Sequence, residues 1–317
     1  MDNSGSLRGA GRYAPTPSGD LHLGNLRTAL LAWLFARTSG RAFLMRIEDL
    51  DRARDAGSAE QQLADLSAIG IDWVGEAMRQ SAQAEAHAAA IERLRASGLV
   101  YECTCTRREI QAAPSAPHGA PGAYPGTCRE LSDAERRAAR QRIAPRHPAL
   151  RLRAPEEYLR GGVAFHDRVL GERRGDVDDL VLQRGDGTVA YNLAVVVDDA
   201  ASGVDQVVRG DDLAPSTPRQ VMLQRLLGLP TPEYAHVPLV LGPTGARLAK
   251  RDGAVTLRDL SASGIGPEDV LALLARSVGL ARSGERPSAS ALLERFDPAV
   301  LSSAPWTFSP DALESDG

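Results

Sequence analysis

The stretch RYAPTPSGDLHLGN at residues 12–25 decides the fold of this chain. Residues 11–14 form a short candidate strand that runs into a loop stiffened by two prolines. Residues 25–37 contain neither glycine nor proline and place their leucines at helical spacing. This order predicts a strand, a loop and a helix.

The junction between this loop and the helix is suited to phosphate. Backbone N–H groups and the helix dipole favour negative charge there, and Gly24 allows a nucleotide to lie close to the backbone. His22 can donate to phosphate oxygens and suits charge that develops on an α-phosphate, although a single His-x-Gly can also be an ordinary loop histidine. The candidate nucleotide-binding residues are Ser18, Gly19, His22 and Gly24.

Composition indicates a soluble, core-forming protein. The chain has 317 residues, a net charge of −4 and 43% apolar residues, which excludes a single small binding module. No apolar run approaches the roughly 20 residues needed to cross a bilayer, and the N-terminal stretch is polar. We therefore expect a cytoplasmic protein of two or three structural units without a membrane contact.

The basic residues are unevenly distributed. Of the 37 basic side chains only Lys250 is a lysine, which indicates either a bias toward arginine codons or a site where a guanidinium cannot replace an ammonium. Residues 136–153 hold seven arginines and no acid. That run is either a solvated helix face or a contact with an RNA backbone.

Strand and helix patterns alternate along the chain and predict an α/β fold with a parallel sheet. Further strands are expected at 42–47, 189–197 and 204–208, and helices at 58–69 (with Ser58 as N-cap), 83–97, 267–278 and 289–296. An insertion is expected to include a helix at 132–143 and strands at 150–153, 163–166 and 180–183. The expected units are residues 1–100 and 189–255 (two halves of the domain that contains the parallel sheet), 101–188 (the insertion) and 256–317 (a helical tail).

All three cysteines, Cys103, Cys105 and Cys128, fall in the insertion. This segment is poor in large apolar residues, so we expect a structural zinc ion to cross-link and stabilise it. Coordination chemistry favours His118 as the fourth ligand, because tyrosine is not among the usual ligands of zinc. Three unconnected thiols are the alternative.

Five ordered motifs resemble those of class I aminoacyl-tRNA synthetases in their glutamyl-specific form, which implies a Rossmann-like catalytic core. The motifs are HLGN at 22–25, MRIEDLD at 45–51, AYNL to DD at 190–199, VRGDD at 208–212 and GARLAKRDG at 245–253. The last is similar to the Lys-Met-Ser-Lys-Ser loop and places the lone lysine on the position that contacts ATP. It departs from that pattern at Arg247, Ala249 and Arg251.

The resemblance implies which residues bind glutamate and which bind ATP. The glutamate set is Arg12, Tyr13, Ala14, Pro15, Thr16, Glu48, Tyr191 and Arg209. The ATP set is Ser18, Gly19, His22, Gly24, Asn25, Arg247, Leu248, Ala249, Lys250 and Arg251, with His22 and Lys250 as the catalytic residues. Two arginines and one carboxylate complement the two carboxylates and the ammonium of glutamate.

The number of residues after the lysine loop indicates which glutamyl-specific synthetases the chain resembles, because only 65 residues run from Gly253 to Gly317. A full glutamyl-tRNA synthetase reads the anticodon with a large region there. The plan instead resembles the glutamyl-queuosine tRNA(Asp) synthetases, short paralogues whose insertion carries a Cys-x-Cys…Tyr-x-x-x-Cys set. That resemblance implies Tyr124, rather than His118, as the fourth zinc ligand.

The expected activity follows from the same resemblance. Glutamate and ATP would form glutamyl-adenylate without tRNA, with Mg²⁺ bound to the ATP, and the glutamyl group would pass to the queuosine base of tRNA(Asp). We expect a monomer. The alternatives are a core-only glutamyl-tRNA synthetase that charges tRNA(Glu), and a non-catalytic zinc-containing RNA-binding paralogue.

Overall fold

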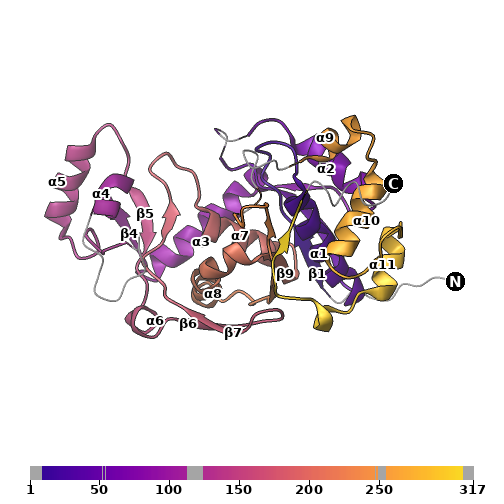
Figure 1. Ribbon diagram of the computed structural model, residues 1–317. Helices are drawn as coiled ribbons and strands as arrows, with labels where there is room; N and C mark the ends of the chain where they lie inside the picture. Colours follow the sequence, from indigo (N-terminus) through magenta and orange to yellow (C-terminus); the bar gives the residue numbers. More distant parts are fainter. Residues whose placement is uncertain are drawn as a thin grey trace.

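The computed structural model describes residues 9–51, 53, 55–112, 124–246, 248 and 255–309. Its centre is a seven-stranded sheet with the strand order β3-β2-β1-β9-β10-β6-β7. Figure 1 labels β1, β9, β6 and β7 of this sheet. All neighbouring strands are parallel except the last pair, β6 and β7. The strands are β1 Ala10–Tyr13, β2 Ala42–Ile47, β3 Met78–Arg79, β6 Val163–Asp167, β7 Gly171–Gly175, β9 Val204–Gly210 and β10 Glu233–Val237.

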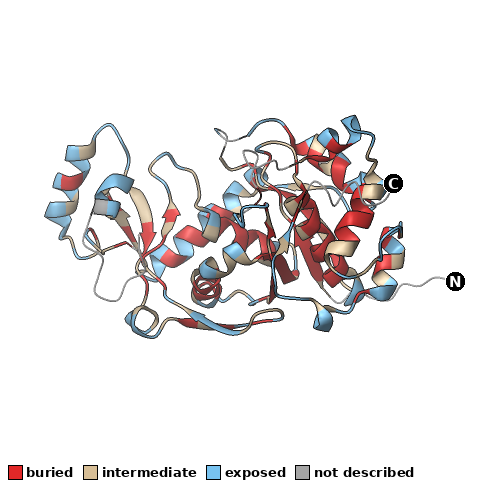
Figure 2. Cartoon of the chain, viewed as in Figure 1, coloured by how far each residue is buried: buried red, intermediate tan, exposed pale blue. Residues whose placement is uncertain are grey.

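Helices cover both faces of this sheet, so that the buried residues form two core clusters. In Figure 2 the residues coloured as buried are concentrated on the central strands and the helices around them. Alternation along β2 shows this division, because Phe43 and Met45 enter one cluster whereas Ala42 and Leu44 pack in the other. The first face carries α1 Leu23–Thr38, α10 Pro267–Ser277 and α11 Ala289–Arg295. The second carries α3 Ala84–Ala96, α7 Tyr191–Ala201 and α8 Thr217–Leu226.

The insertion forms the lobe at the left of Figure 1. Its three antiparallel strands are β4 Val100–Cys103, β5 Ala149–Leu152 and β8 Val181–Gln183, and its helices are α4 Arg107–Ala112, α5 Asp133–Ile143 and α6 Glu156–Gly161. Leu152 and Leu182 belong to the same core cluster as α7 and α8. The lobe is therefore packed onto the catalytic core.

Shorter elements complete the chain. They are α2 Ala59–Ala68, α9 Leu257–Ala262, the 3₁₀ turns η1 Gln80–Gln83, η2 Asp211–Ser216 and η4 Pro298–Val300, and the parallel pair β11 Val240–Leu241 and β12 Trp306–Thr307. Among the described residues, no helix combines the length and the apolar character needed to cross a membrane.

Most expected elements are confirmed within a few residues, but two expectations are wrong. The expected strand at 189–197 does not form, because Tyr191–Ala201 is the helix α7. Its leucine and valines are buried because α3, α8 and β9 pack around the helix. A short run of apolar residues has the same pattern in a buried helix and in a buried strand, so the sequence did not distinguish the two. The strand at 163–166 does not pair within the insertion, since β6 joins the central sheet beside β10.

Candidate active site

A cavity of about 690 Å³ lies at the carboxyl ends of β1 and β9, against the N-terminus of α1. In an open parallel sheet this is where ligands bind. The structure brings the predicted glutamate set together here with part of the predicted ATP set: the lining includes Arg12, Tyr13, Ala14, Pro15, Thr16, Glu48, Tyr191 and Arg209, together with Ser18, Gly19, His22, Gly24 and Asn25.

His22 is the N-cap residue of α1, and its imidazole is oriented by the helix itself. Nδ1 accepts a hydrogen bond from the Gly24 N–H at 3.1 Å, and the Asn25 side chain accepts from the His22 N–H at 3.3 Å. With Nδ1 as acceptor, the neutral ring carries its proton on Nε2. A Cβ on Gly24 would lie 3.0 Å from the imidazole, so glycine leaves room for this ring position. The arrangement provides a donor at a helix N-terminus, where phosphate is favoured.

The loop between β1 and α1 is held from α2. Gln62 is 1% exposed, and its Nε2 donates to the Thr16 carbonyl at 3.0 Å and to the Gly19 carbonyl at 2.6 Å. Ser58 is at the N-cap position of α2 as expected, but its hydroxyl caps nothing in that helix. It accepts instead from the Gly19 N–H at 3.0 Å, which ties the loop to α2.

A buried charge cluster lies behind one end of the cavity, which Arg12 lines. Asp199 of α7 accepts from Arg12 Nε at 3.2 Å and from Arg46 Nη1 at 2.6 Å. Burial by itself would raise the pKa of Asp199, but the two guanidinium groups outweigh it and the pKa lies below its ordinary value. Asp199 therefore stays ionised and fixes both arginines.

Glu48 follows β2 and lines the same cavity, with Arg46 Nη2 3.8 Å from its carboxylate. Burial raises the pKa of Glu48, and the attraction of Arg46 and Arg12 only partly opposes this. A carboxylate that is costly to ionise in this position gains from a cationic partner, such as the ammonium of an amino acid.

Arg209, at the end of β9, is the second guanidinium of the predicted pair and is 5% exposed. Its Nε donates to His236 Nε2 at 3.0 Å and its Nη2 to the Thr217 hydroxyl at 2.8 Å. Tyr191, in the first turn of α7, lines the cavity from its rim and is 37% exposed.

The lysine loop is placed only through its flanks, since Arg247, Ala249, Lys250 and Arg251 lie outside the described residues. Leu248 is buried, and its N–H donates to the Val240 carbonyl at 3.1 Å. On the other side, the Leu23 N–H donates to the Val255 carbonyl at 3.2 Å. Both flanks of residues 249–254 are thus attached beside the cavity wall, next to the start of α1.

Sequence reasoning missed several residues that shape the site, namely Arg46, Gln62, Asp199, Thr217 and His236. Arg46 and Asp199 lie within two of the five motifs, where Asp199 is a possible counter-ion for both Arg12 and Arg46. Gln62, Thr217 and His236 carry no local signal, because only the folding of distant segments brings them to the loop or to Arg209.

The cysteines of the insertion form a second candidate site. The sulfur atoms of Cys103, Cys105 and Cys128 all lie within 4.8 Å of one another, and the Cys105–Cys128 separation is 3.6 Å. The Tyr124 hydroxyl lies 3.3 Å from the Cys103 sulfur and 3.9 Å from that of Cys105. A tetrahedral zinc with Zn–S bonds of about 2.3 Å would place its sulfur ligands roughly 3.8 Å apart. The four side chains therefore fit such an ion, and His118 lies outside the described residues.

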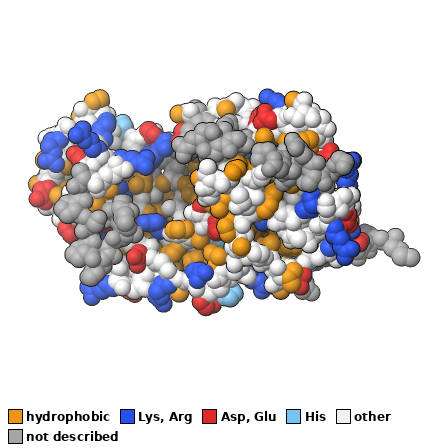
Figure 3. Space-filling view, in the orientation of Figure 1, with side chains coloured by type: hydrophobic (Ala, Val, Ile, Leu, Met, Phe, Trp, Pro, Cys, Tyr) orange, Lys and Arg blue, Asp and Glu red, His pale blue; other side chains and the backbone are white. Residues whose placement is uncertain are grey.

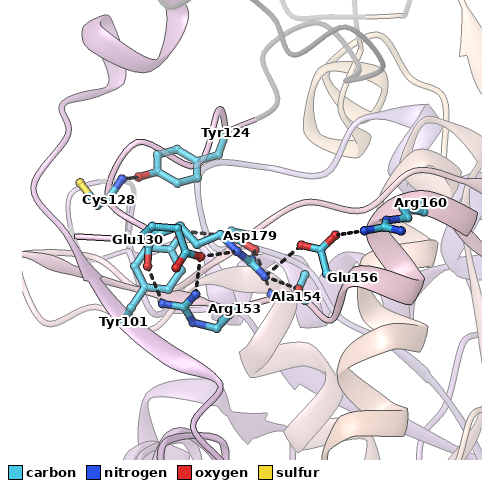
Figure 4. A network of polar contacts seen from close by, with 10 residues as sticks. Tyr101, Tyr124, Cys128, Glu130, Arg153, Ala154, Glu156, Arg160 and Asp179 are labelled. Carbon is cyan, nitrogen blue, oxygen red and sulfur yellow. Dashed lines mark hydrogen bonds and ion pairs between the residues drawn. The ribbon is translucent and has the colours of Figure 1, made fainter. Parts of the chain in front are cut away.

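A polar network supports this cluster from the adjoining sheet (Figure 4). Asp179 accepts from the Tyr101 hydroxyl at 2.6 Å and from the Ala154 N–H at 2.9 Å, and it pairs with Arg129. The Arg151 guanidinium lies 3.7 Å from the centre of the Tyr124 ring. These contacts fix Tyr124 and β4, the strand that ends at Cys103.

The arginine run at 136–153 divides into two groups. Arg151 is buried, Arg136 pairs with Asp133 at 3.6 Å, Arg140 pairs with Glu102, and Arg153 pairs with Glu130 at 2.6 Å, so these four have structural partners. Arg137, Arg142 and Arg146 are exposed in and just beyond α5. Basic side chains gather at that end of the molecule (Figure 3).

Residues 10–315 match the family described as tRNA synthetases class I (E and Q), catalytic domain, and the chain belongs to this family. It is accordingly a ligase of the aminoacyl-tRNA synthetase type, and the resemblance inferred from the motifs is confirmed.

Two similar proteins are named glutamyl-Q tRNA(Asp) synthetase. The one from Nocardia farcinica is 63% identical over 97% of this chain and 96% of its own length. The one from Symbiobacterium thermophilum is 48% identical over 93% and 94%. A crystal structure of a glutamate tRNA ligase from Elizabethkingia meningosepticum in complex with its amino acid superposes with a TM-score of 0.80 at 25% identity, covering 97% of this chain and 68% of that one.

Proposed function

We propose that this protein activates L-glutamate with ATP, without tRNA, and transfers the glutamyl group to the queuosine base of tRNA(Asp). The observation that carries the proposal is the convergence of Arg12, Arg209 and Glu48 with the His22 end of α1 in one cavity. The names of the relatives and the extent to which they align with this chain support the choice of acceptor.

In the first step an oxygen of the α-carboxylate of glutamate attacks the α-phosphorus of ATP, and the bond to pyrophosphate breaks. The nucleophile is the substrate itself, so the protein needs to position it and to stabilise charge. Arg12 and Arg209 bind the carboxylates, Glu48 binds the ammonium, and Tyr191 orients one end from the rim. Tyr13, Ala14, Pro15 and Thr16 supply the wall between them.

The nucleotide occupies the other half of the cavity. Ser18, Gly19, Gly24 and Asn25 form its backbone cradle, and His22 donates from Nε2 to the α-phosphate. Lys250 follows the charge into the transition state, assisted by its neighbours Arg247, Leu248, Ala249 and Arg251. Mg²⁺ accompanies the ATP and neutralises phosphate charge.

The insertion holds one structural zinc through Cys103, Cys105, Tyr124 and Cys128. The sulfur spacing and the position of the Tyr124 hydroxyl support this set. When bound, the ion cross-links a segment that has little apolar core of its own. The exposed arginines of α5 contact the tRNA backbone, and the protein acts as a monomer.

The activation step is tested by glutamate-dependent exchange of pyrophosphate into ATP with no tRNA present. The purified protein should catalyse exchange, Lys250→Ala should abolish it, and Lys250→Arg should restore little of it if a compact ammonium is required. Failure of the parent protein to exchange, when correctly folded, would leave the RNA-binding paralogue as the better explanation.

The acceptor is tested separately with labelled glutamate. Label should appear on tRNA(Asp) that carries queuosine and be missing from tRNA(Asp) without the modified base and from tRNA(Glu). Label on tRNA(Glu) alone would favour the core-only glutamyl-tRNA synthetase instead.

A further inference from the structure

A buried chain of polar side chains connects β6, the strand next to the edge strand β7 of the central sheet, to the cavity. Asp167, the last residue of β6, has its Oδ2 2.6 Å from His236 Nδ1 on β10. His236 Nε2 in turn accepts from Arg209 Nε at 3.0 Å. Both residues are buried: Asp167 is 1% exposed and His236 is 0% exposed. Neither of these two residues lines the cavity, but Arg209 does.

The direction of each hydrogen bond follows from the chemistry of the three groups. A guanidinium only donates, so His236 Nε2 has to accept, and the ring proton is on Nδ1, where it is donated to Asp167. Burial lowers the pKa of His236, and the positive charge on Arg209 acts in the same direction. The imidazole is therefore neutral and held in one tautomer.

The guanidinium of Arg209 is fixed on two sides and unsatisfied on the third. Nε is bound to His236 and Nη2 to the Thr217 hydroxyl. Nη1 is buried and has no partner among the described residues. A buried N–H group without an acceptor costs free energy, which a bound carboxylate would recover. Arg209 thus presents Nη1 in a single orientation.

The geometry points to Asp167 and His236 as positioning residues that hold Arg209 ready for one carboxylate of the amino-acid substrate. The inference rests on the proposed function, because it takes glutamate as the ligand. The hairpin β6–β7 thereby contributes to the cavity without touching it. Loss of the pair should weaken glutamate binding and leave ATP binding nearly unchanged.

Asp167→Asn tests the tautomer. Both carboxylate oxygens accept backbone N–H groups, Oδ1 from Val169 and Leu170 and Oδ2 from His236. An amide has only one acceptor oxygen, which is needed for the N–H groups of Val169 and Leu170. The NH₂ group of the asparagine would then face the imidazole and force Nδ1 to accept. The proton would then move to Nε2 and oppose the Arg209 Nε–H, as with the carboxylate-to-amide change in a serine protease triad.

The experiment measures KM for glutamate and KM for ATP separately by pyrophosphate exchange, together with the thermal unfolding of each variant. His236→Ala and Asp167→Asn should raise KM for glutamate on the order of 10- to 100-fold, with KM for ATP within about 2-fold. His236→Gln should recover most of the loss, because its amide oxygen can replace Nε2 as the acceptor for Arg209.

The chain provides a matched control in His166 and Glu172. These side chains make the same kind of contact at 2.6 Å on the exposed side of the β6–β7 hairpin. His166→Ala should leave both KM values unchanged. The inference is overturned if a folded His236→Ala keeps the parent KM for glutamate, or if both KM values rise together. A folded parent protein with no exchange would instead overturn the proposed function and the inference with it.

Discussion

Burial of the Glu48 carboxylate reduces the stability of the protein, and its proposed role in binding the ammonium of glutamate explains why the residue is there. Because burial raises its pKa, the folded protein binds a proton there more tightly than the unfolded chain does. The stability this group contributes is therefore present at acidic pH and is lost as the pH rises through the pKa of the folded state. Above that pKa the ionised carboxylate destabilises the protein that contains no substrate.

We expect Glu48→Gln to raise Tm and to weaken glutamate binding. The gain in Tm should be roughly 2–4 °C, the shift for about 1 kcal/mol in a large domain, and should be greater at pH 8 than at pH 5. KM for glutamate should rise on the order of 10- to 100-fold, because the ammonium loses its charged partner. Calorimetry across this pH range and exchange kinetics test the prediction, which a lower Tm at pH 8 would contradict.

Asp199 changes the pH dependence of stability in the direction opposite to Glu48, because the pKa of Asp199 lies below its ordinary value. Its contribution to stability is present above the ordinary carboxyl pKa and is lost only as the pH falls through the lowered value. Asp199→Asn should therefore cost about 3–5 kcal/mol at neutral pH, since two buried guanidinium groups lose their partner.

Denaturant unfolding at pH 7 measures this loss. The matched control is Glu60→Gln, because the exposed Glu60 pairs with Arg79 at 3.3 Å and such pairs contribute less than about 1 kcal/mol. An equal effect of the two substitutions would show that Asp199 does not balance the buried arginines.

At the scale of elements, α2 matters because it fixes the nucleotide loop. Gln62→Met keeps the length of the side chain but leaves the carbonyl groups of Thr16 and Gly19 without their donor. We expect KM for ATP to rise about 10-fold, in line with roughly 1–3 kcal/mol for unsatisfied buried groups. Gln61→Met is the control, since Gln61 bonds Asp65 on the same helix. The prediction fails if both substitutions raise KM for ATP alike.

The cysteine cluster is the second prediction at this scale. Metal analysis of the purified protein should find one zinc per chain, and a chelator should remove it and lower the temperature at which the insertion unfolds. Tyr124→Phe should weaken zinc binding, whereas His118→Ala should not. The reverse result would make His118 the fourth ligand.

At the scale of the whole molecule, activation and transfer should be separable. The cavity is lined by the ends of β1 and β9 and the start of α1. These elements and α5 lie in different parts of the elongated molecule (Figure 1). Replacing Arg137, Arg142 and Arg146 by glutamine should leave pyrophosphate exchange intact and raise KM for tRNA. The salt dependence of tRNA binding should also decrease, by about one unit of log–log slope for each phosphate that an arginine no longer neutralises.

The control for this prediction removes the same charge from the C-terminal tail, through glutamine at Arg258, Arg282 and Arg286, which are all exposed. Those substitutions should not change KM for tRNA. Equal effects of the two triple variants would show that net charge, rather than a surface at α5, governs tRNA binding.

The sequence by itself determined the plan of the core and most of the cavity. The loop at residues 12–25 predicted β1, α1 and the nucleotide end, because proline, glycine and leucine spacing act locally. Ordered motifs supplied Arg12, Glu48, Tyr191 and Arg209, which the fold brings into one cavity.

Tertiary structure decided what depends on distant segments. Periodicity did not reveal that residues 191–201 are a buried helix, because the surrounding elements determine burial on all sides. Periodicity also did not place β6 in the central sheet, because the sequence of a strand does not indicate which strand it pairs with. Asp167 and His236 are 69 residues apart, and only the β6–β10 pairing brings them together behind Arg209. Local sequence fixes which conformations a segment prefers, whereas burial and hydrogen-bond partners are properties of the assembled fold.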